Sequence, residues 1–122
     1  YPEGLDIEVF TVEAIKRAYK AATLNSEKEH VTPYVWKNPQ LFKVHNFKND
    51  IDLSTMRWTI DYENDFAFAK EIYKRLYPEK RIFLMDDILN VIAKEPALGR
   101  LNNKIARNEG YAKSLEGEAK NV

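Results

Sequence analysis

The stretch RWTIDYENDF, residues 57–66, decides the predicted fold, because a strand-like run changes into a helical pattern within it. Trp58 to Ile60 are β-branched or aromatic residues typical of a buried strand. From Glu63 onward, apolar residues recur at helical spacing as far as Pro78. Asp61 stands between the two patterns. Because ligands of open α/β sheets collect beyond the carboxyl ends of strands, Asp61 is a candidate ligand for a hard cation such as Mg²⁺. Spacing alone favours the alternative that Asp61 or a neighbour caps the helix.

The residues before this stretch predict one further strand and two helices. Residues 5–10 alternate apolar and acidic side chains, which predicts a strand with one solvated face that carries Glu8. Thr11 then precedes helical spacing over residues 12–24. Ser26 and Glu29 match a capping box and predict a second helix that begins near Glu27 and kinks or ends near Pro33.

The remaining patterns complete an alternation of strands and helices. Strands are predicted at residues 42–47 and 56–60, and a further helix from about residue 86 to the residue before Pro96. Residues 108–111 are typical of a helix stop or a turn, and residues 116–122 are expected to fray. We therefore predict an α/β fold, with residues 1–115 forming one part of a domain and residues 116–122 a tail.

Composition excludes several classes of function. Lys and Arg total 19, as do Asp and Glu, so the net charge is zero and a broad surface for nucleic acid is not expected. The absence of cysteine excludes disulfides, thiolate zinc sites and a cysteine nucleophile. No apolar run approaches the roughly 20 residues of a membrane span, so a cytoplasmic protein without membrane contact is expected. The four glycines are scattered and form no phosphate-binding loop. The start at Tyr1 without Met suggests a piece of a longer protein.

Three polar residues outside the opening stretch are candidates for ligand binding. Glu29 and His30 lie at the front of the predicted second helix, where they could bind a hydroxylated or carboxylated ligand. The capping box already accounts for Glu29, whereas His30 has no such structural explanation. Glu8 is an acid on a half-exposed strand, and such acids are usually only solvated.

Four blocks of the sequence together resemble a known family. They are YPEGLDIEVF, SEKEHVTPYVW, LSTMRWTIDYENDFAFAKEIYKRLY and RNEGYAKSL. In this order they are similar to the spore coat polysaccharide biosynthesis cytidylyltransferases, relatives of the enzymes that activate acylneuraminate and 3-deoxy-manno-octulosonate. The resemblance runs from Tyr1 to about Leu115 and covers only the C-terminal half of such an enzyme. It implies a doubly wound, Rossmann-like fold, Mg²⁺-dependent transfer of CMP from CTP to a sugar or sugar acid, and a homodimer.

The resemblance also implies roles for the candidate residues. Asp61 occupies the place of an Asp that completes the metal site in that family. The resemblance therefore favours a metal-binding role for Asp61 over a role as helix cap. The family pattern Asp-Thr-Pro-Glu-Asp is replaced here by residues 61–65, Asp-Tyr-Glu-Asn-Asp, so the entry into the helix is expected to differ. Glu8, Glu29 and His30 would lie near the sugar.

Two alternatives to an enzymatic role remain open. The family's triphosphate loop and its first metal-binding Asp belong to the N-terminal half, so this chain alone is expected to be inactive. The alternatives are a non-catalytic dimerisation or interaction module and a nucleotide-sugar-binding domain.

Overall fold

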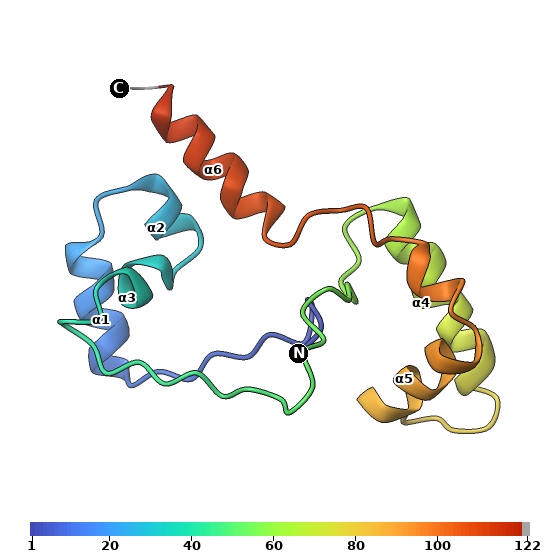
Figure 1. Ribbon diagram of the computed structural model, residues 1–122. Helices are drawn as coiled ribbons and strands as arrows, with labels where there is room; N and C mark the ends of the chain where they lie inside the picture. Colours follow the sequence, from blue (N-terminus) through green and yellow to red (C-terminus); the bar gives the residue numbers. More distant parts are fainter. Residues whose placement is uncertain (121–122) are drawn as a thin grey trace. The chain divides into compact units, whose positions relative to one another are not determined.

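The computed structural model describes residues 1–120, and it is helical, with 48% helix, 2% strand and no sheet. The elements in chain order are α1 (Val12–Ala21), α2 (Asn25–Glu29), α3 (Pro33–Lys37), α4 (Glu63–Leu76), α5 (Met85–Lys94), a 3-10 turn η1 (Leu98–Arg100) and α6 (Glu109–Ala119) (Figure 1). The prediction of an α/β, doubly wound, Rossmann-like fold is therefore wrong for this chain.

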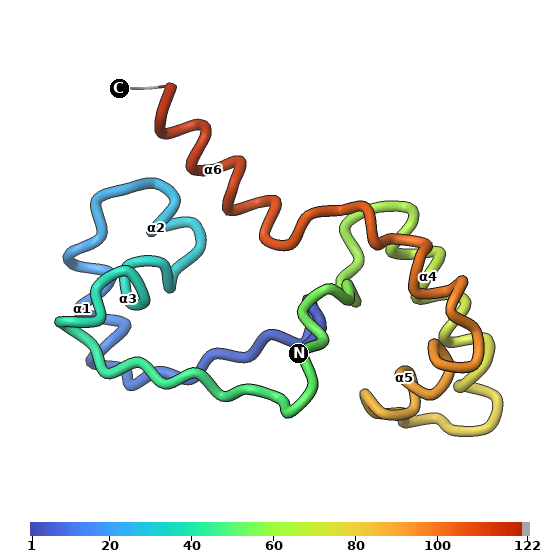
Figure 2. Tube along the Cα trace, in the orientation of Figure 1, coloured from blue at the N-terminus to red at the C-terminus, as the bar shows by residue number. Residues whose placement is uncertain are grey.

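None of the three predicted strands forms. In residues 1–120 the only β pairing is an isolated parallel bridge between Glu3 and Arg57. Residues 5–10 and 42–47 are extended chain without regular structure (Figure 2), and Ile7 and Val9 are 86% and 91% exposed. A β-strand is stabilised by backbone hydrogen bonds to a neighbouring strand. The alternation of side chains determines which residues share a face, but it does not provide the neighbouring strand.

The helices with clear apolar periodicity are confirmed. Thr11 caps α1 as predicted, since its Oγ1 accepts a hydrogen bond from the backbone N–H of Ala14 at 3.1 Å. The helices α4 and α5 begin and end close to the predicted residues. Helix formation depends on neighbours three and four positions apart, so the local sequence determines these elements.

The predicted capping box of Ser26 and Glu29 is wrong. The helix α2 begins at Asn25, and Glu27 caps it by accepting from the backbone N–H groups of Thr23 and Leu24 at 3.2 and 3.4 Å. Pro33 does not kink this helix, because α2 ends at Glu29 and Pro33 begins the separate helix α3, where its missing N–H is not needed.

Residues 108–111, expected to be a helix stop or turn, instead begin α6. Asn108 precedes the helix in a left-handed conformation, with φ of 56°. The helix continues to Ala119, into the range where fraying was expected, while residues 121–122 lie outside the described residues.

The chain divides into two compact units, each built from two separated segments. Unit 1 comprises residues 1–6 and 49–107 and contains α4, α5 and η1. In its core, α4 packs against α5 and η1 through Phe68, Ile72 and Leu98, which are each at most 7% exposed. Trp58 packs against the same core.

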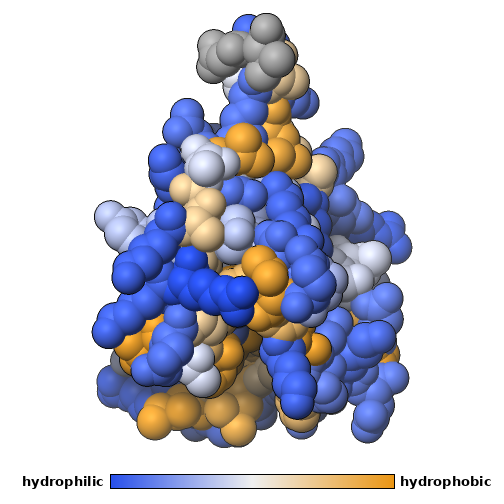
Figure 3. All heavy atoms as spheres, turned by 90° about the vertical axis from the view of Figure 1, so that its left-hand side faces the viewer, coloured by the Kyte–Doolittle hydropathy of each residue, from blue (hydrophilic) through white to orange (hydrophobic). Residues whose placement is uncertain are grey.

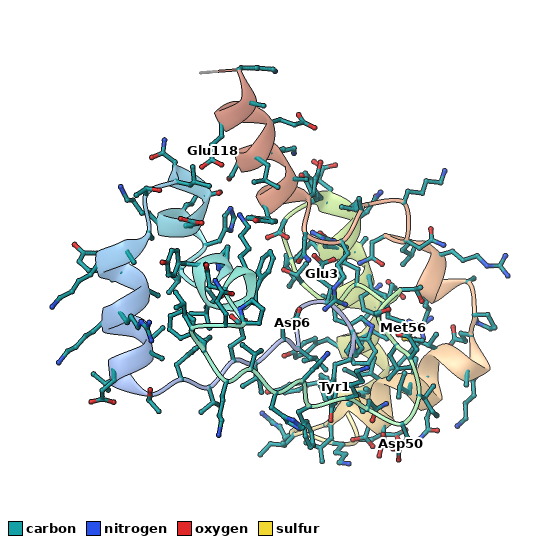
Figure 4. All side chains as sticks on the ribbon, turned by 60° about the vertical axis from the view of Figure 1, so that its left-hand side comes forward. Tyr1, Glu3, Asp6, Asp50, Met56 and Glu118 are labelled. Carbon is teal, nitrogen blue, oxygen red and sulfur yellow. The ribbon has the colours of Figure 1, made fainter. Side chains whose placement is uncertain are left out.

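Unit 2 comprises residues 7–48 and the described residues from Asn108 onward, and contains α1, α2, α3 and α6. Its core is smaller and consists of Ala18, Val35 and Phe42, with Tyr34 packed against it. The helix α6 lies against α2, and Glu118 of α6 extends toward α2 (Figure 4). Its carboxylate accepts hydrogen bonds from the backbone N–H of Ser26 at 2.7 Å and from the Ser26 hydroxyl at 3.0 Å.

Hydrophilic residues dominate the face shown in the space-filling view, with hydrophobic residues in separate patches between them (Figure 3). Among the helices of residues 1–120, none combines the length and the apolar character required to cross a bilayer.

Candidate functional site

A buried guanidinium organises the polar part of unit 1. Arg57 is 6% exposed and contacts three carboxylates. It donates to Asp65 Oδ1 from Nε at 3.0 Å, to Glu3 Oε2 from Nη1 at 2.9 Å and to Asp61 Oδ2 from Nη2 at 2.6 Å. The hydrogen bonds with Asp65, and then that with Glu3, raise the pKa of Arg57, so the guanidinium is always charged. This cluster, Arg57 with Glu3, Asp61 and Asp65, is called the arginine cluster below.

Asp65 is the fully buried member of the arginine cluster. Besides Arg57, it accepts hydrogen bonds from Asn102 Nδ2 at 2.8 Å and from the backbone N–H groups of Asp61 and Tyr62, both at 3.1 Å. Burial acts to raise the pKa of Asp65, but the hydrogen bonds from Arg57, Asn102 and the two backbone groups outweigh it and lower the pKa. Asp65 therefore caps α4 from its third position, which is the role that the sequence left open for Asp61 or a neighbour.

Asp61 remains accessible at the edge of the arginine cluster, with its side chain 59% exposed. Its Oδ2 accepts from Arg57 and, at 3.3 Å, from the hydroxyl of Thr59. It borders a shallow depression, lined also by Ile60, Tyr62, Glu63 and Phe66. Within residues 1–120 no three His, Asp or Glu side chains are grouped so as to hold a metal ion. Asp61 could supply one carboxylate oxygen to Mg²⁺, and the other ligands would have to come from phosphate, water or other residues.

The structure brings Glu29 and His30 together with a residue 84 positions away from His30. His30 Nε2 lies 3.0 Å from Ser114 Oγ, and the Ser114 hydroxyl can donate to Glu29 Oε2 at 2.8 Å or to the Gly110 carbonyl at 3.2 Å. The Glu29 side chain is 65% exposed and that of His30 is 31% exposed. Glu29, His30 and Ser114 are together called the acceptor cluster, because each side chain has an oxygen or nitrogen atom that can accept a hydrogen bond.

Aromatic rings surround the acceptor cluster on one side. The Tyr111 ring meets the His30 ring edge to face at a centroid distance of 5.4 Å and the Trp36 ring at 5.8 Å. The Tyr111 hydroxyl is buried, and the neighbouring Lys37 ammonium lies 5.5 Å from the centre of the Tyr111 ring. Trp36 is 46% exposed. The arrangement joins a carboxylate, a hydroxyl and an imidazole to an apolar wall, which suits a ligand with hydroxyl groups and C–H faces.

Glu8, the remaining predicted site residue, is not part of this arrangement. It lies in the exposed extended segment before α1 and makes no hydrogen bond or ion pair with any residue from 1 to 120. The contacts described here therefore join Glu29 and His30 but not Glu8.

Sequence reasoning missed Ser114 and Tyr111, as well as Arg57, Asp65 and Asn102. One signal was available, because Arg57 is a charge inside an apolar run and such a charge requires buried partners. For Ser114 no local signal exists, since its contacts arise only when α6 lies against α2.

Comparison with known proteins gives one curated relative and no named family. No protein-family profile matches the chain, and no solved structure matches it. Over 112 residues the chain is 34% identical to the uncharacterized protein MJ1063 of Methanocaldococcus jannaschii. The aligned region covers 88% of this chain and 44% of the relative, so the chain spans less than half the length of that protein.

Proposed function

We propose that this chain is the acceptor-binding part of a cytidylyltransferase, an enzyme that transfers CMP from CTP to a sugar or sugar acid in the synthesis of a surface polysaccharide. The proposal rests on the resemblance of four sequence blocks, and the acceptor cluster supports it. Two of those blocks, one with Glu29 and His30 and one with Ser114, lie far apart in the sequence, yet their polar side chains meet. The proposal does not require the Rossmann-like fold that the structure of this chain contradicts.

The acceptor cluster would bind and orient the sugar. The Glu29 carboxylate, whose side chain is 65% exposed, would accept hydrogen bonds from two sugar hydroxyls. Ser114 already contacts both Glu29 and His30 and would hold the two side chains in place. An attacking sugar hydroxyl held in this way gains its rate chiefly from orientation toward the α-phosphate of CTP.

Glu29→Gln is expected to raise the KM for the sugar by about 10- to 100-fold and to leave the KM for CTP unchanged, because a hydrogen bond to a charged group contributes about 1.5–3 kcal/mol. The assay is CTP turnover with a panel of sugars and sugar acids, using the longer protein that contains these residues. Glu13→Gln, an exposed acid in the first turn of α1, is the matched control. An equal rise in both KM values, or none, would exclude sugar binding by Glu29.

Asp61 would place Mg²⁺ beside the phosphates of CTP. When bound, Mg²⁺ would neutralise negative charge on the phosphates and on the departing pyrophosphate. Asp61 suits this role because its side chain is accessible and Arg57 holds Oδ2, which leaves Oδ1 for a cation. Glu3 and Asp65 do not fit a ligand role in this arrangement, because their side chains are only 14% and 0% exposed.

Asp61→Ala is expected to lower Mg²⁺-dependent turnover by at least about 100-fold, the typical loss when one group that stabilises transition-state charge is removed. The same enzyme assay measures it across a series of Mg²⁺ concentrations. Asp86→Ala on α5 controls for loss of an exposed acid, and circular dichroism establishes that the helices persist. Unchanged turnover would mean that Asp61 serves only as a partner of Arg57. The 122-residue chain alone is expected to be inactive, and turnover by this chain would contradict the division of the enzyme into two parts.

A further inference from the structure

Unit 1 contains a cavity of about 370 Å³ that is lined neither by the acceptor cluster nor by Asp61. Residues 55–58 form one side of it, Phe68 of α4 and Ile92 of α5 form another, and residues within 96–103, around η1, form the rest (Figure 1). Sites for small molecules typically enclose about 300–1,000 Å³. The cavity is therefore large enough for a small organic molecule.

Part of the cavity lining is apolar. Phe68 is 4% exposed, and Met56, Trp58 and Ile92 are half-buried. Phe68 belongs to the core of unit 1, and Trp58 and Ile92 pack against that core, so neighbouring side chains hold this part of the lining in place. A ligand with an apolar body would cover these side chains and release water from them, and a ring would suit the indole of Trp58.

Arg100 gives the cavity an unpaired positive charge. Its side chain is exposed and makes no hydrogen bond or ion pair with any residue from 1 to 120. By contrast, the guanidinium of Arg57, which also lines the cavity, already contacts three carboxylates. Among residues 1–120, no Asp or Glu lines the cavity. A carboxylate could therefore form two hydrogen bonds with Arg100 without displacing another partner.

Asn102 gives the cavity a buried acceptor. The residue is 3% exposed, and its Nδ2 donates to the Arg57 carbonyl at 2.9 Å and to Asp65 Oδ1 at 2.8 Å. Both amide hydrogens are thereby used, whereas Oδ1 accepts no hydrogen bond from residues 1–120. A buried acceptor without a donor is costly, so a ligand that donates to Oδ1 would gain affinity.

We propose that this cavity binds a small hydroxylated monocarboxylate with an apolar, ring-containing body. The carboxylate pairs with Arg100, the hydroxyl donates to Asn102 Oδ1, and the ring packs on Trp58. A hydroxyl fits better than an ammonium as the donor, because an ammonium would find no acidic partner in the lining. The site is distinct from the proposed sugar site, since a sugar acid lacks the apolar body, and it does not depend on the proposed enzymatic function.

Three related compounds test the proposal with the 122-residue chain in a Trp36→Phe background, where Trp58 is the remaining tryptophan and its fluorescence reports binding. 3-Phenyllactate has all three features and is expected to give a saturable change, with a dissociation constant of about 1 mM or lower for a molecule of this size. 3-Phenylpropionate lacks the hydroxyl and is expected to bind about 3- to 10-fold more weakly. 3-Phenyl-1,2-propanediol lacks the carboxylate and is expected to bind at least about 10-fold more weakly.

The hydroxyl is removed from the ligand, and Asn102 is left in place, because Asn102 also holds Arg57 and Asp65 and its replacement would disturb the fold. Equal binding of 3-phenyllactate and 3-phenylpropionate would overturn the contact with Asn102. Phenyl phosphate is expected to bind more weakly than 3-phenyllactate, since a single unpaired guanidinium matches a single negative charge. Tighter binding of phenyl phosphate would overturn the choice of a carboxylate.

Arg100→Gln is expected to raise the dissociation constant of 3-phenyllactate at least about 10-fold and to leave that of the diol unchanged, because only the acid can pair with the guanidinium. Lys70→Gln on α4 is the matched control, since Lys70 is an exposed cation that does not line the cavity. Circular dichroism establishes that the variants retain their helices. The absence of any saturable change in Trp58 fluorescence would overturn the proposal, and so would an equal loss for acid and diol in Arg100→Gln. None of these measurements involves CTP, so their outcome is separate from the test of the proposed function.

Discussion

Replacing Asp65 with alanine is expected to lower the free energy of unfolding of unit 1 by about 3–5 kcal/mol, the loss seen when one partner of a buried ion pair is removed. Asp65 is fully buried and accepts two hydrogen bonds from Arg57 and one from Asn102. Without its carboxylate, Arg57 would keep only the more accessible Glu3 and Asp61 as partners. The cap of α4 would be lost at the same time, because Asp65 also accepts from the backbone N–H groups of Asp61 and Tyr62.

Urea unfolding followed by tryptophan fluorescence measures this loss. The chain has two tryptophans, Trp58 in unit 1 and Trp36 in unit 2, so a Trp36→Phe background makes the signal specific to unit 1. Asp86→Ala, an exposed acid on α5, is expected to change stability by less than about 0.5 kcal/mol. A loss below about 1 kcal/mol in Asp65→Ala would show that the arginine cluster does not stabilise the unit.

Lowering the pH reproduces part of this loss without mutation. The pKa of Asp65 in the folded state lies below its ordinary value of 3.8. A carboxyl with a lowered pKa contributes its full stabilisation above the pKa of the unfolded state, near 4, and loses it as the pH falls through the folded value. The difference in stability between wild type and Asp65→Ala should therefore shrink between pH 5 and the acid range.

The same cluster shows how far the sequence could predict this molecule. Thr11 and the apolar periodicity of α1 and α4 depend on residues three or four positions away, and those helices were predicted correctly. Arg57 and Asp65 are close in sequence, but the cluster also needs Glu3 and Asn102, which lie 54 and 45 positions from Arg57. No local pattern encodes such contacts, so the sequence could point to Asp61 but not to the guanidinium that holds it.

Strand prediction failed for a related reason. The alternation of residues 5–10 specifies which side chains share a face, but it does not specify a pairing partner. In residues 1–120 the only β pairing is the bridge between Glu3 and Arg57. Arg57 belongs to the predicted strand 56–60, whereas Glu3 belongs to none of the predicted strands. Glu29 and His30 are adjacent in the sequence and could be named together as candidates, whereas Ser114 comes from a helix that was expected to be a turn and a frayed tail.

Gly4→Ala is expected to lower the free energy of unfolding of unit 1 by about 2–3 kcal/mol, because it strains the backbone at the bridge that positions Glu3. Gly4 has a φ of 99°, a conformation that residues with a Cβ rarely adopt. An added Cβ would lie 2.7 Å from the backbone nitrogen of Thr59 and 2.7 Å from the carbonyl carbon of Trp58. Neither atom can rotate away, since both belong to the main chain. The bridge must therefore open, and its hydrogen bond from Trp58 N to the Glu3 carbonyl, 2.7 Å long, would weaken.

Gly117→Ala is the matched control, because it adds the same methyl group within α6, where no described atom other than those of its chain neighbours and its own helix backbone lies within 4 Å of the new Cβ. There alanine is expected to stabilise unit 2 by up to about 1 kcal/mol, since it favours the helix over glycine. The two variants are measured by urea unfolding, with Trp58 reporting on unit 1 and Trp36 on unit 2. If the two variants change the free energy of unfolding with opposite signs, the destabilisation by Gly4→Ala arises at the Glu3–Arg57 bridge and not from the added methyl group as such. If Gly4→Ala unfolded at the same urea concentration as the wild type, the close approach of Gly4 to Trp58 and Thr59 could not be what holds Glu3 against Arg57.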